Sequence, residues 1–333
     1  MDAVLTIYHE NIPDFLREFA ATPPMERIRS VGMNCGCEYT NFPRFRELLP
    51  YSRYDHSLGA ALIVWHFTHN REQALAALFH DVTTPVFAHV VDFLNGDHLR
   101  QESTEAGVAE CLAASREVCA LLEKYGIALE DIADYHRYPI ADNDSPALSA
   151  DRLEYTIGNL YNYGFADLVT LRGFYNDLTV GTDERGVPEL VFRTPAVAAD
   201  FALAALNTAR VYVADEDRFA MESLAILLRQ AVERGVLTMA DLWRTEPEVI
   251  AKLLADPVCA EAWRGYRRYS CILRRDERPA EGLWLQVNAK KRWIDPLAAG
   301  QGRVSCWHEE SRRQITEFCG QDFSCWLSAE LGV

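Results

Sequence analysis

The sequence has no apolar run long enough to cross a membrane as a helix. The longest such stretch extends from about Ser57 to Phe67, whereas a membrane-spanning helix needs roughly 18 to 20 residues. The opening residues, MDAVLTIYHENIPDF, lack the basic and then apolar segments of a signal peptide. Internal repeats and low-complexity tracts are also missing. We therefore expect a soluble, cytoplasmic protein with no membrane partner.

Basic residues are in the minority, with 33 Lys and Arg against 49 Asp and Glu and a formal net charge of −16. This balance argues against duplex nucleic acid as a partner, although a local basic pocket could hold one small phosphorylated ligand. The nine cysteines are odd in number and irregularly spaced, which favours a reducing compartment over a disulfide framework. A phosphate-binding glycine loop, a dinucleotide fingerprint and a Gly-x-Ser-x-Gly elbow are all absent.

Helical periodicity is the most common pattern in the sequence. Apolar residues recur at three and four positions, which predicts helices over residues 57–69, 71–79, 86–94, 102–125, 149–163, 196–213 and 217–234. Two β-type runs around a Gly and Pro turn predict a hairpin within 178–194, and we expect strands within 282–297 and a helix over 305–331. The fold class is therefore all-α, mainly helical, with a small strand-containing C-terminal region. We place the domains at 1–177 and 178–333.

Four residues on or beside the predicted helices can bind a metal: His56, His80, Asp81 and Asp151. A divalent ion needs several nitrogen and oxygen donors that converge on one point, and rigid helix ends can supply them. Each residue alone is a weak signal, because a His-Asp pair is common and a single His is usually a core or surface residue.

The order and surroundings of these residues are more specific. The relevant segments are MERIRSVG (25–32), RYDHSLG (53–59), HDVTTPVFAHVVD (80–92) and DRLEY (151–155). Over about residues 25–165 the chain resembles the HD-domain metal-dependent phosphohydrolase superfamily, and the flanking text is most like its deoxynucleoside triphosphate triphosphohydrolase branch. The resemblance implies an HD-domain helical bundle within 1–177, preceded by an N-terminal segment, and a homo-oligomer.

The resemblance also implies roles for individual residues. One divalent ion (Mn, Fe, Mg, Ni or Zn) would be held by His56, His80, Asp81 and Asp151. Arg53, Arg152 and Tyr155 would bind the substrate, a small phosphorylated molecule of nucleotide type. Metal-activated water would then cleave its phosphate ester or anhydride. The residues that could assist catalysis are Asp81, His89, Asp92 and Glu102, and a second metal could be held by His98 and His136.

Two departures from the family pattern leave a second reading open. Thr84 stands where the triphosphohydrolase branch has a catalytic histidine, and Gln101 precedes Glu102 where the branch has another. Neither side chain titrates near neutral pH. The alternative is therefore a catalytically silent protein that binds a nucleotide or metal as a sensor or scaffold. Lys290, Lys291 and Arg292 form a basic cluster that is either a solvated strand end or a contributor to phosphate affinity.

Overall fold

The computed structural model of the chain describes residues 1–91 and 107–332. About 54% of the chain is helical, which confirms the mainly-α prediction. The helices that precede the hairpin are α1 (Asp2–Tyr8), α2 (Asp14–Ala20), α3 (Pro23–Ile28), α4 (Arg53–Thr68), α5 (Arg71–Phe79), α7 (Val108–Ala114), α8 (Arg116–Tyr125), α9 (Ala150–Asn162) and α10 (Leu168–Asn176).

The second half of the chain mixes helices with short strands. Its elements are β1 (Leu178–Thr182), β2 (Pro188–Phe192), α11 (Pro195–Val211), α12 (Asp215–Glu233), α13 (Glu246–Ala255), α14 (Pro257–Arg267), β3 (Tyr269–Arg275), β4 (Leu297–Ala298), β5 (Gly302–Arg303), α15 (Val304–Trp307), α16 (Glu309–Cys319) and β6 (Trp326–Leu331). The predicted hairpin is present, because β1 pairs antiparallel with β2, with Leu178 opposite Phe192. β4 then adds to β2 in parallel, and β5 pairs antiparallel with β4.

Two hydrophobic cores each contain residues from both halves of the sequence. One core combines side chains of α4, α5 and α9 with Phe192, Phe201 and Ile294, which all follow residue 177. A second core combines Phe42 and Phe87 with side chains of α12, α13 and α14. Each core thus draws on both sides of the boundary that we placed at residue 177.

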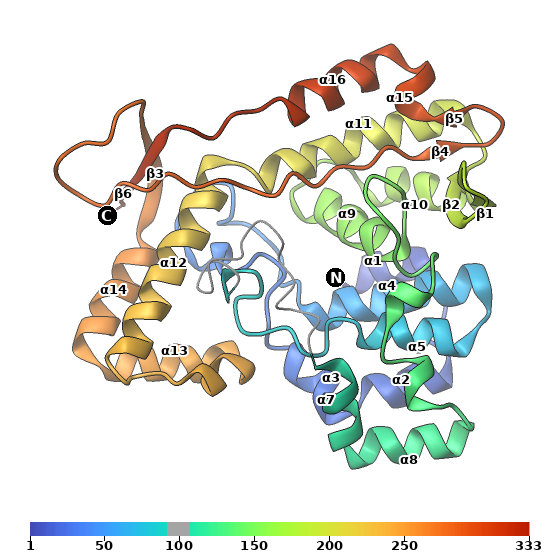
Figure 1. Ribbon diagram of the computed structural model, residues 1–333, viewed down its shortest axis with the longest axis horizontal. Coiled ribbons are helices and arrows are strands. Elements are labelled where there is room, and N and C mark those ends of the chain that lie inside the picture. The colour runs from blue at the N-terminus through green and yellow to red at the C-terminus, as the bar shows by residue number, and fades with distance from the viewer. Residues whose placement is uncertain (92–106, 333) are drawn as a thin grey trace.

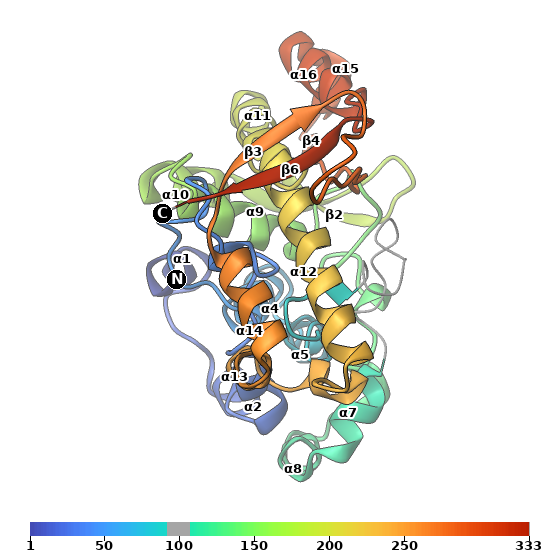
Figure 2. The ribbon, with the colours of Figure 1, turned by 90° about the vertical axis from the view of Figure 1, so that its left-hand side faces the viewer.

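Residues 276–296 make a long extended excursion between β3 and β4. In Figure 1 this orange segment runs along α11, and Ala289 and Trp293 pack there against a cluster formed by α11 and the α16 region. Within this stretch the chain pairs at Leu285, whose backbone exchanges hydrogen bonds of 2.8 and 2.7 Å with Leu327. The chain then returns through α15 and α16 to β6, which pairs antiparallel with β3, as Figure 2 shows.

Three local predictions were wrong. The helix expected over 86–94 is replaced at residues 86–89 by turns, since Phe87 and Ala88 adopt left-handed backbone angles (φ 57° and 48°) that a helix excludes; residues 92–94 lie outside the described part. The helix expected over 305–331 ends at Cys319, because the chain beyond it becomes β6. The strands expected over 282–297 are mostly extended chain without a partner strand.

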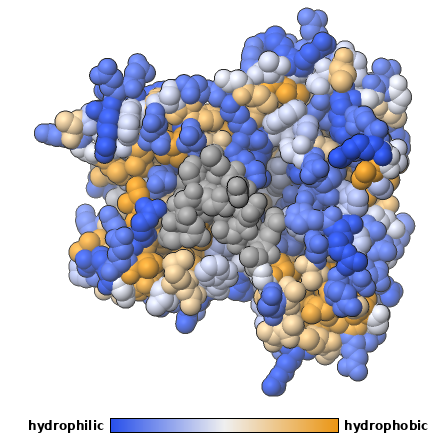
Figure 3. All heavy atoms as spheres, in the orientation of Figure 1, coloured by the Kyte–Doolittle hydropathy of each residue, from blue (hydrophilic) through white to orange (hydrophobic). Residues whose placement is uncertain are grey.

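Among the described residues no single helix is both long and apolar enough to cross a membrane; α11 and α12 pass that test only as a joined pair, bent by 42°. Hydrophilic side chains cover most of the face drawn in Figure 3, in keeping with the large number of charged residues.

Candidate metal centre

His56 lies in the first turn of α4, at a position that the helix cap fixes. Ser52 is the N-cap residue: its hydroxyl accepts from the Asp55 amide at 3.2 Å, and the Asp55 carboxylate accepts from the Ser52 amide at 2.9 Å. This reciprocal capping box satisfies two amides that a helix start leaves unpaired. Both Arg53 and His56 are therefore held near the end of the helix, and both are buried.

His80 and Asp81 follow the last residue of α5. Nδ1 of His80 lies 2.7 Å from the Ala77 carbonyl and donates to it, since a carbonyl can only accept. Arg27 holds the turn that follows, because its guanidinium donates to the carbonyls of Val82 and Thr84, each at 2.8 Å. Thr84 is fully buried, and its hydroxyl donates to Oδ1 of Asp81 at 2.9 Å.

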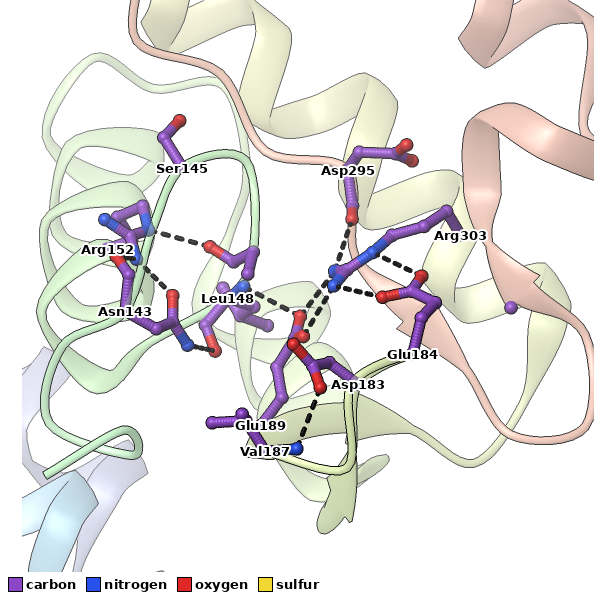
Figure 4. A network of polar contacts seen from close by, with 12 residues as sticks. Asn143, Ser145, Leu148, Arg152, Asp183, Glu184, Val187, Glu189, Asp295 and Arg303 are labelled. Carbon is purple, nitrogen blue, oxygen red and sulfur yellow. Dashed lines mark hydrogen bonds and ion pairs between the residues drawn. The ribbon is translucent and has the colours of Figure 1, made fainter.

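Asp151 lies in the first turn of α9, after the Ser149 cap. The segment that leads into this helix is anchored from the second half of the chain, as Figure 4 shows. Glu189 on β2 accepts from the Leu148 amide at 3.0 Å. Its two oxygens also accept from Arg303 on β5, at 2.6 and 2.8 Å. The position of Asp151 thus depends on a buried ion pair between β2 and β5.

The three helix ends bring His56, His80 and Asp151 to one point. Nε2 of His56 lies 3.0 Å from Oδ1 of Asp151 and 3.2 Å from Nε2 of His80, and the His80 to Asp151 distance is 3.5 Å. Adjacent ligands of an octahedral ion with bonds of about 2.1 Å lie about 3.0 Å apart. Oδ2 of Asp81 is slightly farther, at 3.9 and 3.7 Å from the two Nε2 atoms. The spacing of this donor set fits one divalent cation.

The tautomers of the two histidines also fit a cation. Nδ1 of His56 lies 2.6 Å from Oε2 of Glu154, and Nδ1 of His80 bonds to a carbonyl. If Nδ1 carries the proton in both rings, both Nε2 lone pairs face the same point, which leaves a cation as the natural partner. Glu154 is itself held by the Tyr51 hydroxyl at 2.5 Å and by the Tyr8 hydroxyl at 3.3 Å.

Groups of opposite charge lie close together at this centre in the metal-free protein. Burial lowers the pKa of His56, but hydrogen bonds to Asp151 and Glu154 outweigh this effect and raise the pKa to about 10. Burial raises the pKa of Asp81, but Arg53, with Nη1 2.8 Å from Oδ2, and the two histidines hold it well below its usual range. Hydrogen bonds from His56 and His80 likewise lower the pKa of Asp151 against the effect of burial. The carboxylates are therefore ionised and ready to bind a cation.

The metal centre lies in the wall of a cavity of about 180 Å³. Asp151, Tyr155, Asn159 and Tyr163 line it from one face of α9 and its C-terminal end, since residues four apart share a helix face. Lys290 and Arg292 line it from the extended segment 276–296. They are two positions apart and so point to the same side. Lys291 between them turns away and donates to the carbonyls of Cys319 and Gln321.

The other residues singled out in the sequence lie in different places. Arg53, His89 and Tyr155 line the cavity, and Nε2 of His89 is 3.5 Å from Arg292. The structure does not bring Arg152 to the cavity. Its guanidinium donates hydrogen bonds to the carbonyls of Ala147 and Asn143 and lies 3.3 Å from the Asp142 carboxylate; Figure 4 shows Arg152 beside Asn143. His136 is half exposed and pairs with Asp142 at 2.9 Å. Four residues lie outside the described part of the chain: Asp92, His98, Gln101 and Glu102.

Sequence reasoning gave no role to several residues that the structure brings to this region. Glu154 stands inside the DRLEY segment, three residues after Asp151, but nothing in the sequence shows its contact with His56. Asp217 and Tyr212 line the cavity from the region around the start of α12. For Lys290 and Arg292 the sequence did contain one signal, because two basic residues at alternate positions of an extended segment lie on the same side.

Comparison with known proteins supports the chemistry of this centre. No protein-family model matches the chain. An uncharacterized protein, YdhJ, of Bacillus subtilis is 26% identical over 255 residues, which cover 74% of this chain and 72% of that protein. The metal-dependent phosphohydrolase cns2 of Cordyceps militaris is 24% identical over 254 residues, which cover 74% of this chain and 70% of that protein. Together with the histidine and aspartate cluster, this distant relative supports a metal-dependent phosphohydrolase of HD type.

Proposed function

We propose that the protein hydrolyses a phosphate ester or anhydride of a nucleotide-like substrate in the cavity described above. The observation that carries the proposal is the convergence of His56, His80 and Asp151 within 3.0 to 3.5 Å of one another, in a wall of a cavity that is also lined by basic side chains. A divalent ion held by these residues and Asp81 would polarise the phosphoryl group and lower the pKa of water.

The chain's own residues then bind and orient the phosphate. Arg53 is buried and paired with Asp81, so its guanidinium is fixed next to the proposed metal ligands, and its Nε has no hydrogen-bond partner in the part of the chain that the structure describes. Lys290 and Arg292 add positive charge on the same cavity. In a site shielded from water, such cations stabilise the charge that develops on the phosphoryl oxygens.

His89 is our candidate for proton transfer to the leaving oxygen. It lines the cavity, and imidazole titrates in the range that this task requires. Thr84, which stands in place of the family histidine, donates its hydroxyl to Asp81 from a fully buried position. Its role in this site is therefore to hold Asp81.

The burial of Thr84 also favours the second candidate function, a catalytically silent protein that binds a metal and a nucleotide. Both candidates are tested by one experiment. Metal-stripped protein is reloaded with Mn, Fe, Ni, Zn or Mg and incubated with nucleoside mono-, di- and triphosphates, and the products are separated by chromatography. Metal content is measured in parallel.

Asp151→Asn keeps the shape of the side chain and removes a charged ligand. Asp144→Asn, in the segment that precedes α9, is the matched control, since the Asp144 side chain is 90% exposed. The hydrolase proposal requires product from the wild type and the control, and loss of both product and bound metal in Asp151→Asn. Tight metal binding without turnover of any nucleotide would instead establish the silent binder.

A further inference from the structure

The cavity continues beyond the metal ligands along α9. Asp151 and Tyr163 lie twelve residues apart, which corresponds to about 18 Å at 1.5 Å per residue. Farther along α9 the cavity is lined by Asn159 and Tyr163, and also by Asn34 and Asp217. Asp217 lies near Tyr163, since burial and the charge of Asp217 together raise the pKa of that tyrosine. The Tyr163 hydroxyl donates to Oδ1 of Asn34 at 3.1 Å, which fixes both side chains. We call this part of the cavity, defined by Asn159 and Asp217, the acceptor end.

Asn159 presents an acceptor that no described residue uses. Its side-chain amide nitrogen donates to the Tyr212 hydroxyl at 2.8 Å, whereas Oδ1 is buried without a hydrogen-bond partner among residues 1–91 and 107–332. The residue is only 5% exposed. A buried acceptor that stays unpaired is destabilising, and native proteins contain few of them. Because Asn159 lines the cavity, a ligand can supply the donor.

Asp217 adds a second acceptor from α12. Its carboxyl accepts a hydrogen bond from the Cys37 thiol at 3.7 Å, and a thiol is a weak donor. Burial raises the pKa of Asp217 to about 7, although Cys37 and the nearby Arg218 and Arg44 lower it. A ligand that donates N–H groups would satisfy this carboxylate much better than the thiol does.

Aromatic rings also line the cavity. The rings of Tyr155 and Tyr212 lie 6.1 Å apart and nearly perpendicular, and Tyr163 follows at the end of α9. Tyrosine rings are among the side chains on which nucleobases stack. The cavity thus offers the candidate metal ligands, cations, aromatic rings and two acceptors.

We propose that Asn159 and Asp217 select nucleobases that present an exocyclic amino group to the acceptor end. This inference rests on the proposed function and deepens it by naming the class of base. An amino group supplies two N–H donors to two acceptors, whereas a carbonyl in its place sets lone pair against lone pair. One well-placed set of such contacts discriminates by about 1 to 3 kcal/mol, or roughly 5- to 150-fold.

The experiment compares matched amino and oxo substrates on the metal-loaded protein. The pairs are AMP with IMP and CMP with UMP, and kcat/KM is measured for each. We expect the amino member to be favoured by about tenfold or more. Asp217→Asn introduces an N–H donor while Asn159 remains an acceptor. It should therefore bring the ratio of kcat/KM between the amino and oxo substrates toward one. Glu216→Gln is the matched control on the same helix, since Glu216 pairs loosely with Arg44 at 3.9 Å, and should keep the wild-type ratio.

Binding of nucleosides to the metal-free protein, measured by calorimetry, separates this inference from the proposed function. Turnover with equal kcat/KM and equal nucleoside binding within each pair would overturn the acceptor site and leave the hydrolase standing. If no nucleotide is turned over, but adenosine and cytidine bind better than inosine and uridine and Asp217→Asn removes the difference, the acceptor site stands and the hydrolase fails. Equal or no binding together with no turnover would overturn both.

Discussion

Nδ1 of His56 lies 2.6 Å from Oε2 of Glu154, and this contact determines which nitrogen of the ring faces His80 and Asp151. Glu154 is 1% exposed and is held in turn by the Tyr51 hydroxyl. The carboxylate therefore orients a candidate metal ligand from the side of the ring that faces away from His80 and Asp151, an arrangement that is common around metal-bound histidines.

Glu154→Gln should weaken metal binding by about 10- to 100-fold, the usual effect of losing such an orienting carboxylate. Chelator competition against a series of divalent ions measures the affinity directly. Glu123→Gln on the exposed side of α8 is the control. An unchanged affinity in a folded Glu154→Gln protein would show that the ring is oriented by other contacts.

Arg303→Ala should lower the free energy of unfolding by about 3 to 5 kcal/mol, because it leaves the Glu189 charge buried without its partner. Denaturant unfolding followed by circular dichroism measures the change. Arg313→Ala removes two exposed ion pairs, to Glu310 and Glu317, and should cost far less, because solvent screens exposed pairs. Equal costs for the two variants would contradict the role given to the buried pair. Since Glu189 also holds the segment before α9, Arg303→Ala should weaken metal binding too.

Arg292→Gln and Lys290→Gln should each raise KM for a phosphorylated substrate by about tenfold or more, since a charge-assisted hydrogen bond contributes about 1.5 to 3 kcal/mol. Lys291→Gln is the internal control, because Lys291 donates to carbonyls outside the cavity and should leave KM unchanged. Steady-state kinetics on the three variants distinguish the positions. A rise in KM for Lys291→Gln alone would show that Lys291 faces the cavity and that Lys290 and Arg292 point away from it.

Stability should fall as the pH rises from about 5 to 8, because of Glu38. Burial and the neighbouring Glu246 raise the pKa of Glu38 to about 8, from 4.5 in an unfolded chain. Between these values the native state holds a proton that the unfolded state has lost, so raising the pH favours unfolding. The melting temperature across this range, measured by calorimetry, should decline in the wild type and decline less in Glu38→Gln. Parallel curves for the two proteins would exclude Glu38 as the cause.

The sequence located the helices that carry the candidate metal ligands better than the rest of the site. Periodicity placed His56 directly before a helix over 57–69, which in the structure begins four residues earlier, at Arg53. It placed His80 directly after a helix over 71–79, and these boundaries of α5 were predicted to the residue. The fold then brings these residues together with Asp151, as the resemblance implied. The local pattern was sufficient there because each ligand lies within a turn of a helix end.

Contacts between distant segments could not be predicted in the same way. β6 was interpreted as helix because its strand character depends on pairing with β3, more than 50 residues earlier. Phe87 and Ala88 are apolar residues in a helical pattern, and only their packing against α12 and α14 explains the turn that they adopt. Arg292 and Asp217 line the cavity because of how distant segments of the chain pack together. Local periodicity does not predict that packing.

The excursion between β3 and β6 also determines when the cavity can form during synthesis. His56, His80 and Asp151 are translated early, but the segment before Asp151 is anchored only after β2 and β5 have been made, and Lys290 and Arg292 also follow α9. A ribosome-bound chain that has just completed α9 therefore lacks both the ion pair that anchors this segment and the cavity wall formed by residues 276–296.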